Sequence, residues 1–496
     1  MEAGVVLSLD EGTTGATAVA VGMDGTVRGK GYREIAQSYP RPGWVEHDPN
    51  EIWAAVQSSA RDALAAAAVG SNDVRAIGIT NQRETLVLWD RRTLEPLSPA
   101  IVWQDRRTAE HCDRLRAAGH EARVREVTGL LLDPYFTATK LAWALRNVDR
   151  AENAAWGTVD SWLVARLSNG RDHVTDASNA SRTSLFDITR GVWSDEMAEL
   201  FGVNLKGLPR VVDSSGEISR SDPAAFGGVA APISGIAGDQ QSALFGQVCT
   251  VPGMAKNTYG TGSFLLMQTG DQRAGSSSGM LTTVAWRREG RLSYALEGAI
   301  FVTGAALQWL RDGLGIIGSA AEAGPIAASV PDSAGVFLVP AFVGLGAPRW
   351  DPYARGAILG LTRGSGRAQL VRAAVESMAY QTRDVVEAME HDTGGRLESL
   401  RVDGGAAVMD VLCQFQADLL GIPVQRPRQT ETTALGAAFL AGLGAGLWTE
   451  PDLGDLWKLD REFEPGMSRD QAGALQARWR QAVERSLRWA EPDPPR

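Results

Sequence analysis

The chain has few of the residues from which metal clusters and disulfide frameworks are built. Its three cysteines, Cys112, Cys249 and Cys413, lie far apart and form no CxxC pair. The five histidines show no metal-ligand spacing either. A zinc cluster and a disulfide scaffold are therefore not expected, and the cysteines are predicted to pack in the core of a protein from a reducing compartment.

Long apolar runs and an excess of positive charge are also missing. No stretch reaches the roughly 20 apolar residues of a membrane span, and residues 1–4 lead into a short apolar run without a basic signal region. We expect no membrane insertion and a cytoplasmic location. The formal net charge of -10 argues against a nucleic-acid partner, because a phosphate backbone attracts basic patches.

The common nucleotide-binding loops are absent as well. The sequence contains no GxxxxGK[ST] loop, and no GxGxxG turn follows a strand with an acidic residue at the expected spacing. The glycine-rich loop and the HRD and DFG motifs of protein kinases are missing too. Phosphate chemistry needs only local donors, so a nucleotide site built in another way is still possible.

The order of elements predicts an α/β protein of more than one domain, since 496 residues are too many for a single compact core. Apolar runs at 5–9 and 18–21 flank a polar turn, and Asp24-Gly25 is typical of a hairpin. A helix is expected from Asp48, which offers an N-cap acceptor, with Pro49 in the first turn and Glu51 in a capping box, to Gly70. Strands at 74–80, 86–89 and 100–103 and helices at 107–118 and 140–148 follow.

A second α/β unit is predicted to begin near residues 249–253. Short strands at 254–258 and 264–268 flank the turn 259–263, which repeats the strand–turn–strand arrangement at the start of the chain. We therefore divide the chain into domains 1–250 and 251–496 with a cleft between them. Long helices are expected in the second domain at 368–390, 408–420, 433–443 and 469–489.

Three glycine turns are candidates for binding phosphates. In Asp10–Thr14 a tight hairpin can direct backbone N–H groups at anionic oxygens, two threonine hydroxyls add donors, and Asp10 is a possible Mg²⁺ ligand. Residues 259–262 and 401–406 are glycine turns that end strands, where phosphates often bind. The alternative for each turn is an ordinary solvated connection.

Other polar runs favour a hydroxylated acceptor. Arg83 and Glu84 are adjacent in a polar run between strands, and a guanidinium with a carboxylate can bind vicinal hydroxyls. Asp239 follows an apolar strand and is a candidate to accept a hydroxyl proton. The rings of Trp103, Tyr135 and Phe264 could cover a short carbon chain, although each could equally be a core aromatic.

Seven longer segments carry a resemblance to a known family. They are PGWVEHDP (42–49), TNQRET (80–85), IVWQDRRT (101–108), DPYF (133–136), GIAGDQQ (235–241), NTYGTG (257–262) and WDPYARG (350–356). In this order, from about Val5 to Trp489, the chain resembles the glycerol-phosphorylating members of the FGGY carbohydrate kinase family.

The resemblance implies an actin/hexokinase-like fold, in which two ribonuclease-H-like α/β domains surround a central cleft. It implies ATP and glycerol as substrates, Mg²⁺ held by Asp10, Asp239 as the general base, and a homo-oligomer as one possible assembly. The implied glycerol-binding residues are Arg83, Glu84, Trp103, Tyr135, Asp239, Gln240 and Phe264. The implied nucleotide-binding residues are Thr13, Thr14, Thr261, Gly304, Gln308 and Gly405.

The chain departs from the family pattern on the nucleotide side. Gly15 and Thr17 stand where the family has a serine and an arginine, Met409 replaces an asparagine, and Glu11 replaces a glutamine. We expect these changes to weaken nucleotide binding, since a hydroxyl, a cation and an amide are lost and a negative charge is added. A kinase for another small polyol, and a glycerol-binding sensor with impaired phosphoryl transfer, are therefore the alternatives.

One regulatory property can be predicted from the sequence. Some bacterial relatives bind fructose 1,6-bisphosphate through a glycine-rich loop that carries an arginine, whereas residues 226–232 here contain no basic residue and no histidine. Fructose 1,6-bisphosphate should leave the rate of glycerol-dependent ADP release unchanged, because nothing in this loop neutralises its phosphates. A steady-state assay with inorganic phosphate as the control anion tests this, and specific inhibition by the bisphosphate would contradict it.

Overall fold

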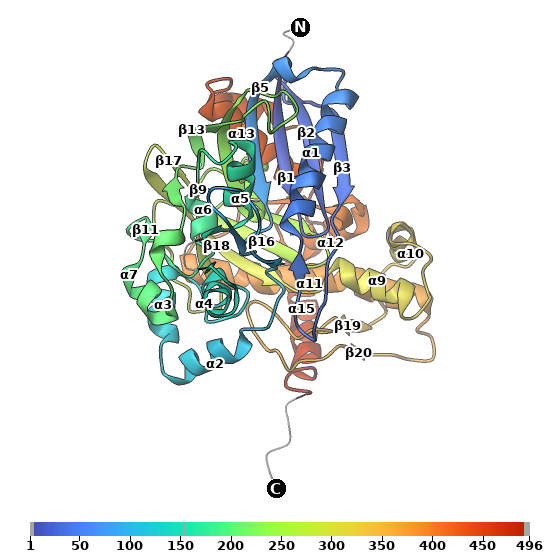
Figure 1. Ribbon diagram of the computed structural model, residues 1–496. Helices are drawn as coiled ribbons and strands as arrows, with labels where there is room; N and C mark the ends of the chain where they lie inside the picture. Colours follow the sequence, from blue (N-terminus) through green and yellow to red (C-terminus); the bar gives the residue numbers. More distant parts are fainter. Residues whose placement is uncertain (1–3, 152–153, 491–496) are drawn as a thin grey trace.

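Residues 4–151 and 154–490 are described in the computed structural model of the chain. Among these residues the largest sheet is mixed and has thirteen strands, in the order β23-β22-β21-β15-β16-β18-β17-β13-β14-β5-β1-β2-β3. Figure 1 shows the strands of the first half (blue) beside helix α1, and the strands of the second half (yellow) lying across the middle of the molecule.

In the first half of the sheet a meander is extended by parallel strands. The strands β1 (Val5–Glu11), β2 (Gly15–Gly22) and β3 (Val27–Glu34) are antiparallel. On its other side β1 pairs in parallel with β5 (Val74–Asn81), and β5 pairs in parallel with β14 (Pro232–Gly238). Parallel neighbours require crossover segments, which helices supply.

The second half of the sheet has the same arrangement. Here β15 (Ala255–Tyr259), β16 (Ser263–Gly270) and β18 (Arg291–Ile300) are antiparallel. The strands β21 (Leu400–Asp403) and β22 (Val424–Pro427) then continue in parallel from β15. The predicted α/β class with two ribonuclease-H-like halves is therefore confirmed.

The two halves share one sheet and part of one core. The strand β13 (Ser215–Arg220) meets β17 (Leu281–Arg288) at a single parallel pair. Helix α13 (Thr432–Gly444) belongs to the second half of the chain but packs on the first-half strands. Its Ala434 and Ala438 join Val6 of β1 in one hydrophobic cluster. The division at residue 250 remains a prediction.

The remaining elements complete the layers around this sheet. The helices are α1 (Pro49–Ala66), α2 (Ala109–Ala117), α3 (Glu121–Thr128), α4 (Thr137–Asn147), α5 (Val159–Leu167), α6 (Ala177–Ala180), α7 (Asp195–Phe201), α8 (Asp239–Gly246), α9 (Gly304–Asp312), α10 (Ala323–Ala328), α11 (Arg367–Thr393), α12 (Asp410–Leu420), α14 (Glu450–Leu456) and α15 (Arg469–Glu484). The shorter strands are β4 (Glu46–His47), β6 (Val87–Trp89), β7 (Ala100–Ile101), β8 (Ala155–Gly157), β9 (Val174–Asp176), β10 (Phe186–Asp187), β11 (Val192–Trp193), β12 (Arg210–Val212), β19 (Phe337–Val339), β20 (Ala357–Leu359) and β23 (Leu459–Phe463).

Local predictions failed where tertiary contacts compete with the local pattern. Asp48 accepts a hydrogen bond from the N–H of Asn50, as an N-cap should, but the capping box is not formed. Instead, the Glu51 carboxylate accepts from the N–H of Ala36 at 2.9 Å. The last helix ends at Glu484 rather than at residue 489, and the chain continues in turns that dock Arg488 on Asp351.

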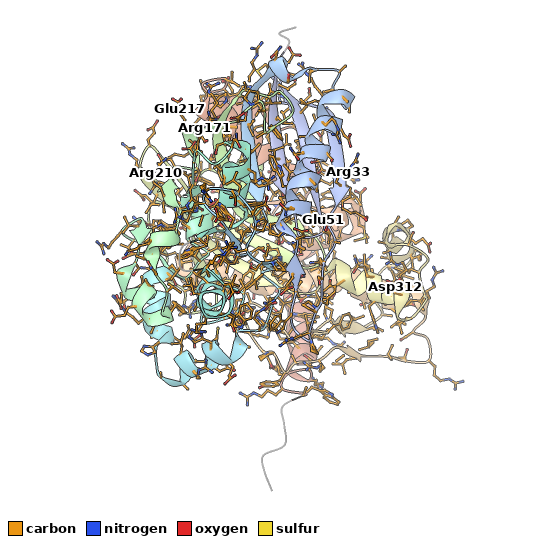
Figure 2. The ribbon with its side chains drawn as sticks, in the orientation of Figure 1. Arg33, Glu51, Arg171, Arg210, Glu217 and Asp312 are labelled. Atoms are coloured by element: carbon orange, nitrogen blue, oxygen red, sulfur yellow. The ribbon has the colours of Figure 1, made fainter. Side chains whose placement is uncertain are left out.

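The surface and the interior separate as the composition indicates. All three cysteines are free and buried, as predicted. Figure 2 shows charged side chains such as Arg171, Arg210, Glu217 and Asp312 at the periphery of the ribbon. None of the helices in the described ranges is both long enough and apolar enough to cross a membrane.

The contact between α8 and α13 predicts a stability effect. A Cβ added at Gly436 would overlap the backbone oxygen of Ser242, so the two helices would have to separate. Gly436→Ala should therefore lower the free energy of unfolding by about 1–3 kcal/mol, measured by urea denaturation. The matched control is Gly473→Ala in α15, where nothing lies within 4 Å of the added carbon. The control should raise stability by up to about 1 kcal/mol, and equal effects at both sites would contradict the close-packing argument.

Candidate active site

The register of the parallel strands brings the predicted acceptor residues to one edge of the sheet. Thr80 lies opposite Asp10, and Asn81 lies opposite both Glu11 and Gly238. The carboxyl ends of β1, β5 and β14 are therefore level, and the loops that follow them converge there. This edge carries Asp10, the Arg83–Glu84 pair and Asp239, which begins α8.

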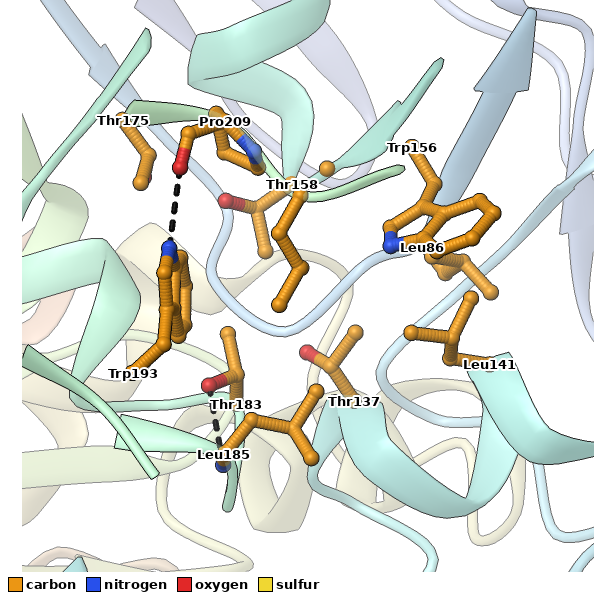
Figure 3. Close-up of a pocket in the computed structure, with 12 residues that line it drawn as sticks. Leu86, Thr137, Leu141, Trp156, Thr158, Thr175, Thr183, Leu185, Trp193 and Pro209 are labelled. Carbon is orange, nitrogen blue, oxygen red and sulfur yellow. Dashed lines mark hydrogen bonds between the residues drawn. The ribbon is translucent and has the colours of Figure 1, made fainter. Parts of the chain in front are cut away.

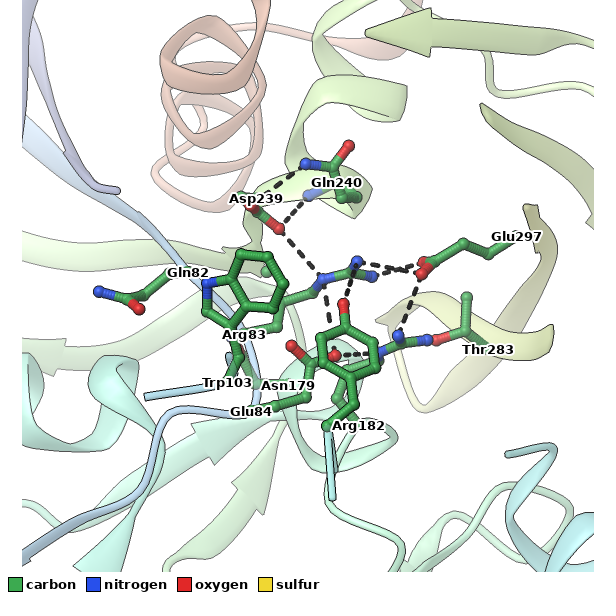
Figure 4. A network of polar contacts seen from close by, with 12 residues as sticks. Gln82, Arg83, Glu84, Trp103, Asn179, Arg182, Asp239, Gln240, Thr283 and Glu297 are labelled. Carbon is green, nitrogen blue, oxygen red and sulfur yellow. Dashed lines mark hydrogen bonds and ion pairs between the residues drawn. The ribbon is translucent and has the colours of Figure 1, made fainter. Parts of the chain in front are cut away.

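Arg83 is at the centre of a buried ionic network that joins the two halves (Figure 4). Its guanidinium contacts the Glu297 carboxylate of β18 through two hydrogen bonds, of 2.5 and 3.1 Å. Its Nε lies 3.1 Å from Oδ1 of Asp239. Only 2% of the Arg83 side chain is exposed, against 29% for Asp239. The carboxylate that faces the open side is therefore Asp239.

A second arginine completes the network. Arg182 Nε donates to Glu84 at 2.6 Å, and its Nη2 donates to Glu297 at 3.0 Å. Arg83 and Glu84, adjacent in sequence, approach only to 3.9 Å, so Arg182 is the nearer partner of Glu84. Burial alone would raise the pKa of Glu297, but Arg182 and Arg83 outweigh it and lower that pKa to about 2. Glu297 is therefore an ionised bridge between two guanidinium groups.

Aromatic rings line the same space, as the sequence predicted for them. Trp103 and Tyr135 pack edge to face with their centroids 5.6 Å apart, and Arg83 Nη2 lies 3.4 Å from the Tyr135 hydroxyl. The Phe264 ring lies 5.8 Å from the Arg83 guanidinium carbon. Phe264 and Tyr135 also pack against core clusters of buried residues, so these rings lie between the core and the Arg83 network.

Gln240 is oriented by a buried lysine. Its Oε1 accepts from Lys256 Nζ at 2.6 Å, which leaves its Nε2 to donate to Asp239 Oδ2 at 3.1 Å. The Gln240 backbone N–H donates to Asp239 Oδ1 at 2.7 Å. Burial lowers the pKa of Lys256 to about 8, against the opposing effect of Asp403 and Asp239. Lys256 lies on β15, so it couples the acceptor site to the second half.

The first glycine turn lies beside this acceptor site. Trp103 Nε1 donates to Thr13 Oγ1 at 2.9 Å, so one indole links the aromatic wall to the β1–β2 turn. Thr14 follows, and its backbone oxygen lies 3.4 Å from the Tyr32 hydroxyl of β3.

Asp10 is half-buried close to other carboxylates. Burial raises the pKa of Asp10 to about 8, Asp239 and Glu431 act in the same direction, and Lys30 opposes them. A carboxylate held in such surroundings favours a bound cation. The residues described contain no cluster of three or more metal-binding side chains. This is compatible with Mg²⁺, which often takes one or two carboxylates and obtains its other ligands from phosphates and water.

The effect expected of Glu11 on the nucleotide stays a prediction. Its side chain lies on the opposite face of β1 from Asp10, fully buried, with Oε1 accepting from Gln82 Nε2 at 3.0 Å. Burial holds the pKa of Glu11 well above its usual range.

In the second half, two glycine turns and a helix start meet. Gly304 begins α9, and its N–H donates to the Gly260 oxygen at 3.0 Å. The N–H of Ala305 donates to the Thr261 oxygen at 3.0 Å. Gly404 has a φ of 84°, and a Cβ there would come within 2.5 Å of the Tyr259 oxygen. Glycine is thus required where the third turn passes the second.

A pocket of about 500 Å³ opens next to these turns. Its lining includes Gly405, Met409, Leu307 and Pro325. Met409 packs its side chain towards Gly324, so this wall carries a thioether where the family has an amide. Gln308 follows Leu307 on α9 and is exposed.

A second cavity is too small for a substrate. It has a volume of about 10 Å³ and lies among Leu86, Leu141, Trp156 and Leu185 (Figure 3). This is about the space of one water molecule, and Trp156 Nε1, which lines the cavity, has no hydrogen-bond partner. This cavity is therefore not a candidate for the acceptor site.

The comparisons with known proteins agree with this geometry. The N-terminal domain of the FGGY family of carbohydrate kinases matches residues 5–246, and the C-terminal domain of that family matches residues 255–445. The chain belongs to the FGGY family of carbohydrate kinases. The resemblance on which the sequence predictions depend is thereby confirmed.

The similar proteins of the FGGY family include several that are named glycerol kinase. The chain is 57% identical to glycerol kinase from Dechloromonas aromatica, over 98% of each chain. It is 55% identical to glycerol kinase 2 from Thermotoga maritima, over 98% of this chain and 99% of that protein. A crystal structure of Plasmodium falciparum glycerol kinase with ADP superimposes with a TM-score of 0.90, at 33% identity and 98% coverage of both chains.

Three residues of this FGGY site were missed from the sequence. Glu297 lies in a largely apolar segment, Arg182 lies in the polar run 176–184, and Lys256 stands just before the NTYGTG segment. The sheet, which aligns β15 with β16 and β16 with β18, brings Lys256 to Gln240 and Glu297 to Arg83, and Arg182 follows α6. A buried charge within an apolar strand such as β18 was the available signal.

The ionic network predicts a large effect of one charge. Glu297→Gln should lower the free energy of unfolding near neutral pH by about 3–5 kcal/mol, because two buried guanidinium groups lose their shared counter-charge. The carboxylate's contribution is complete above its unfolded pKa of 4.5 and is lost as the pH falls towards about 2. The difference between the variant and the wild type in urea denaturation should therefore shrink over that range. Glu217→Gln, at an exposed position, is the control, and an equally small effect at both positions would contradict the prediction.

Proposed function

We propose that the chain transfers the γ-phosphoryl group of ATP to a terminal hydroxyl of glycerol, forming sn-glycerol 3-phosphate and ADP. The observation that carries this proposal is the contact of Arg83 and Gln240 with the part-exposed carboxylate of Asp239, with the Tyr135 hydroxyl accepting a hydrogen bond from Arg83. The relatives named glycerol kinase, which match nearly the whole chain, support the choice of glycerol.

The acceptor site suits a short polyol. Arg83 and Glu84 offer a fixed donor and a fixed acceptor for neighbouring hydroxyls, since their partners Glu297 and Arg182 hold them in place. Trp103, Tyr135 and Phe264 surround the position for the carbon chain. The aromatic wall leaves little room for a longer sugar, which favours glycerol over larger substrates of the FGGY family.

Asp239 is assigned the role of general base. As the glycerol oxygen bonds to the γ-phosphorus, the bond from that phosphorus to the β,γ-bridging oxygen breaks, and the hydroxyl proton passes to the Asp239 carboxylate. Arg83 and Gln240 fix the orientation of this carboxylate through both of its oxygens. The acceptor is thus aligned before the transfer.

The nucleotide is assigned to the turns on both sides of the cleft. Thr13, Thr14 and Thr261 would donate to the phosphates, and Gly304 and Gly405 would allow the chain to approach them closely. The 500 Å³ pocket beside Gly405 and Met409 would receive the nucleoside, with Gln308 at its margin. Met409 offers no amide, so the nucleobase would be held mainly by apolar contacts.

Asp10 is the residue that would hold Mg²⁺. Its burial next to Asp239 and Glu431, which raises its pKa, is relieved when a cation binds. Bound Mg²⁺ would neutralise charge on the transferring phosphates.

Replacement of the proposed base tests this function. Asp239→Asn should lower kcat for glycerol-dependent ADP release by about 10²–10⁴-fold, because the amide cannot accept the proton. A coupled assay with purified protein measures this, and Asp312→Asn, at the exposed end of α9, should retain full activity. A wild-type protein without glycerol-dependent turnover, or with a clear preference for a pentulose, would contradict the proposal. Glycerol binding without MgATP binding in calorimetry would instead favour the sensor.

A further inference from the structure

Three strands present one face to the nucleotide side of the cleft. In the antiparallel register Asp10 of β1 lies opposite Thr17 of β2, and Thr17 lies opposite Tyr32 of β3. Directly opposed residues point to the same face of a sheet. Lys30 is two residues from Tyr32 along β3, so its side chain leaves the sheet on this face too.

Lys30 reaches from this face to the second half of the chain. Its Nζ lies 2.6 Å from Oε1 of Glu431, the residue that precedes α13. The side chains of Lys30 and Glu431 are 45% and 34% exposed. A partly exposed ion pair of this kind is weak and exchanges readily, so the ammonium is free to turn towards a stronger anion.

The cleft beside Lys30 carries an excess of negative charge. Asp239 and Glu431 lie close enough to Asp10 for their negative charges to raise its pKa, and the positive charge of Lys30 lowers it. A triphosphate adds further negative charge at the same place. Thr17, which stands opposite Asp10, brings no charge of its own.

A second contact places a side chain of β3 against the β1–β2 turn. A Cβ at Gly15 would come within 2.6 Å of the Tyr32 ring, so the glycine allows that ring to lie against the β1–β2 turn. The Tyr32 hydroxyl donates to the Thr14 backbone oxygen at 3.4 Å. Tyr32 and Lys30 of β3 thus lie on the same face of the sheet as Gly15, which has no side chain, and Thr17, which has no charge.

We propose that Lys30 is a positioning residue for the nucleotide, whose ammonium offsets the charge of the phosphates. This inference rests on the proposed function, because it assumes that a metal-bound nucleotide meets Asp10. Glu431 holds Lys30 while the cleft is empty, and the phosphates compete for it when they enter. Lys30 thereby supplies from β3 the positive charge that an arginine at position 17 would supply from β2.

Kinetics of two Lys30 variants provide the first test. Lys30→Met should raise KM for MgATP about five- to tenfold, the effect of one lost charge–charge contact in a partly exposed site. KM for glycerol should stay nearly unchanged, since the acceptor site is held by the Arg83 network. Lys30→Arg keeps the charge and should retain the wild-type KM for MgATP. Unchanged KM for MgATP in Lys30→Met would overturn the inference.

A second-site change tests the exchange of roles between β2 and β3. Thr17→Arg in the Lys30→Met background returns a cation to the position opposite Asp10, so it should restore most of the lost affinity for MgATP. A mere structural role of Lys30 predicts no rescue, because the arginine does not reform the contact with Glu431.

The ion pair itself provides a test of opposite sign. If Lys30 only ties the two halves together, then Glu431→Gln and Lys30→Met should impair the enzyme alike. Our inference predicts instead that Glu431→Gln lowers KM for MgATP, because it releases Lys30 and removes a negative charge near Asp10. A raised KM in Glu431→Gln would overturn the inference, and this variant decides the question even if Lys30→Met fails to fold.

Nucleotide binding gives a readout apart from turnover. Lys30→Met should weaken the binding of MgADP about five- to tenfold, the effect of one lost charge–charge contact in a partly exposed site.

Calorimetric titration with MgADP measures this loss of affinity. Lys30→Arg should bind MgADP as the wild type does, and an unchanged affinity in Lys30→Met would overturn the inference. Because the titration needs no turnover, it also separates the two claims. A wild type that binds MgADP but does not phosphorylate glycerol would refute the proposed function and leave the role of Lys30 to the binding data.

Discussion

The buried contact of Glu297 with Arg83 and Arg182 is the interaction on which the site depends. Two guanidinium groups share one carboxylate in a place closed to water, and such a cluster is stable only when every charge has its partner. Glu297 comes from the second half of the sheet, whereas the arginines come from the first. The geometry of the acceptor site is therefore set by the union of the two halves.

This union also explains how the carboxylate of Asp239, the proposed general base, is oriented. Asp239 is held by Arg83 on one side and by Gln240 on the other, and Gln240 is in turn fixed by Lys256 of β15. The acceptor site thus has supports from both halves, in keeping with a reaction that requires donor and acceptor to be aligned. The partly exposed position of Asp239 leaves it accessible to a substrate.

The nucleotide side has a different character. Its turns are held mainly by backbone contacts, such as those of Gly304 and Ala305 with the 260–261 turn, and its pocket is largely apolar. Backbone contacts tolerate side-chain replacement, which is why the substitutions at positions 15, 17 and 409 leave the architecture intact. Glu11 is fully buried on the face of β1 opposite to Asp10, so its side chain points away from the Asp10 face of the sheet.

The sequence by itself determined the α/β class, the repeated strand–turn–strand units, the family and most of the residues that meet in the cleft. Motifs such as TNQRET and GIAGDQQ are local, and the turn geometry and strand ends that they require are local as well. Glu297, Arg182 and Lys256 could not be predicted, because nothing near them in the chain reveals their partners. Their role was decided by the pairing of strands far apart in the sequence. The same holds for Glu11 and Lys30, because only the tertiary structure fixes which face of the sheet a charge occupies and how much water reaches it.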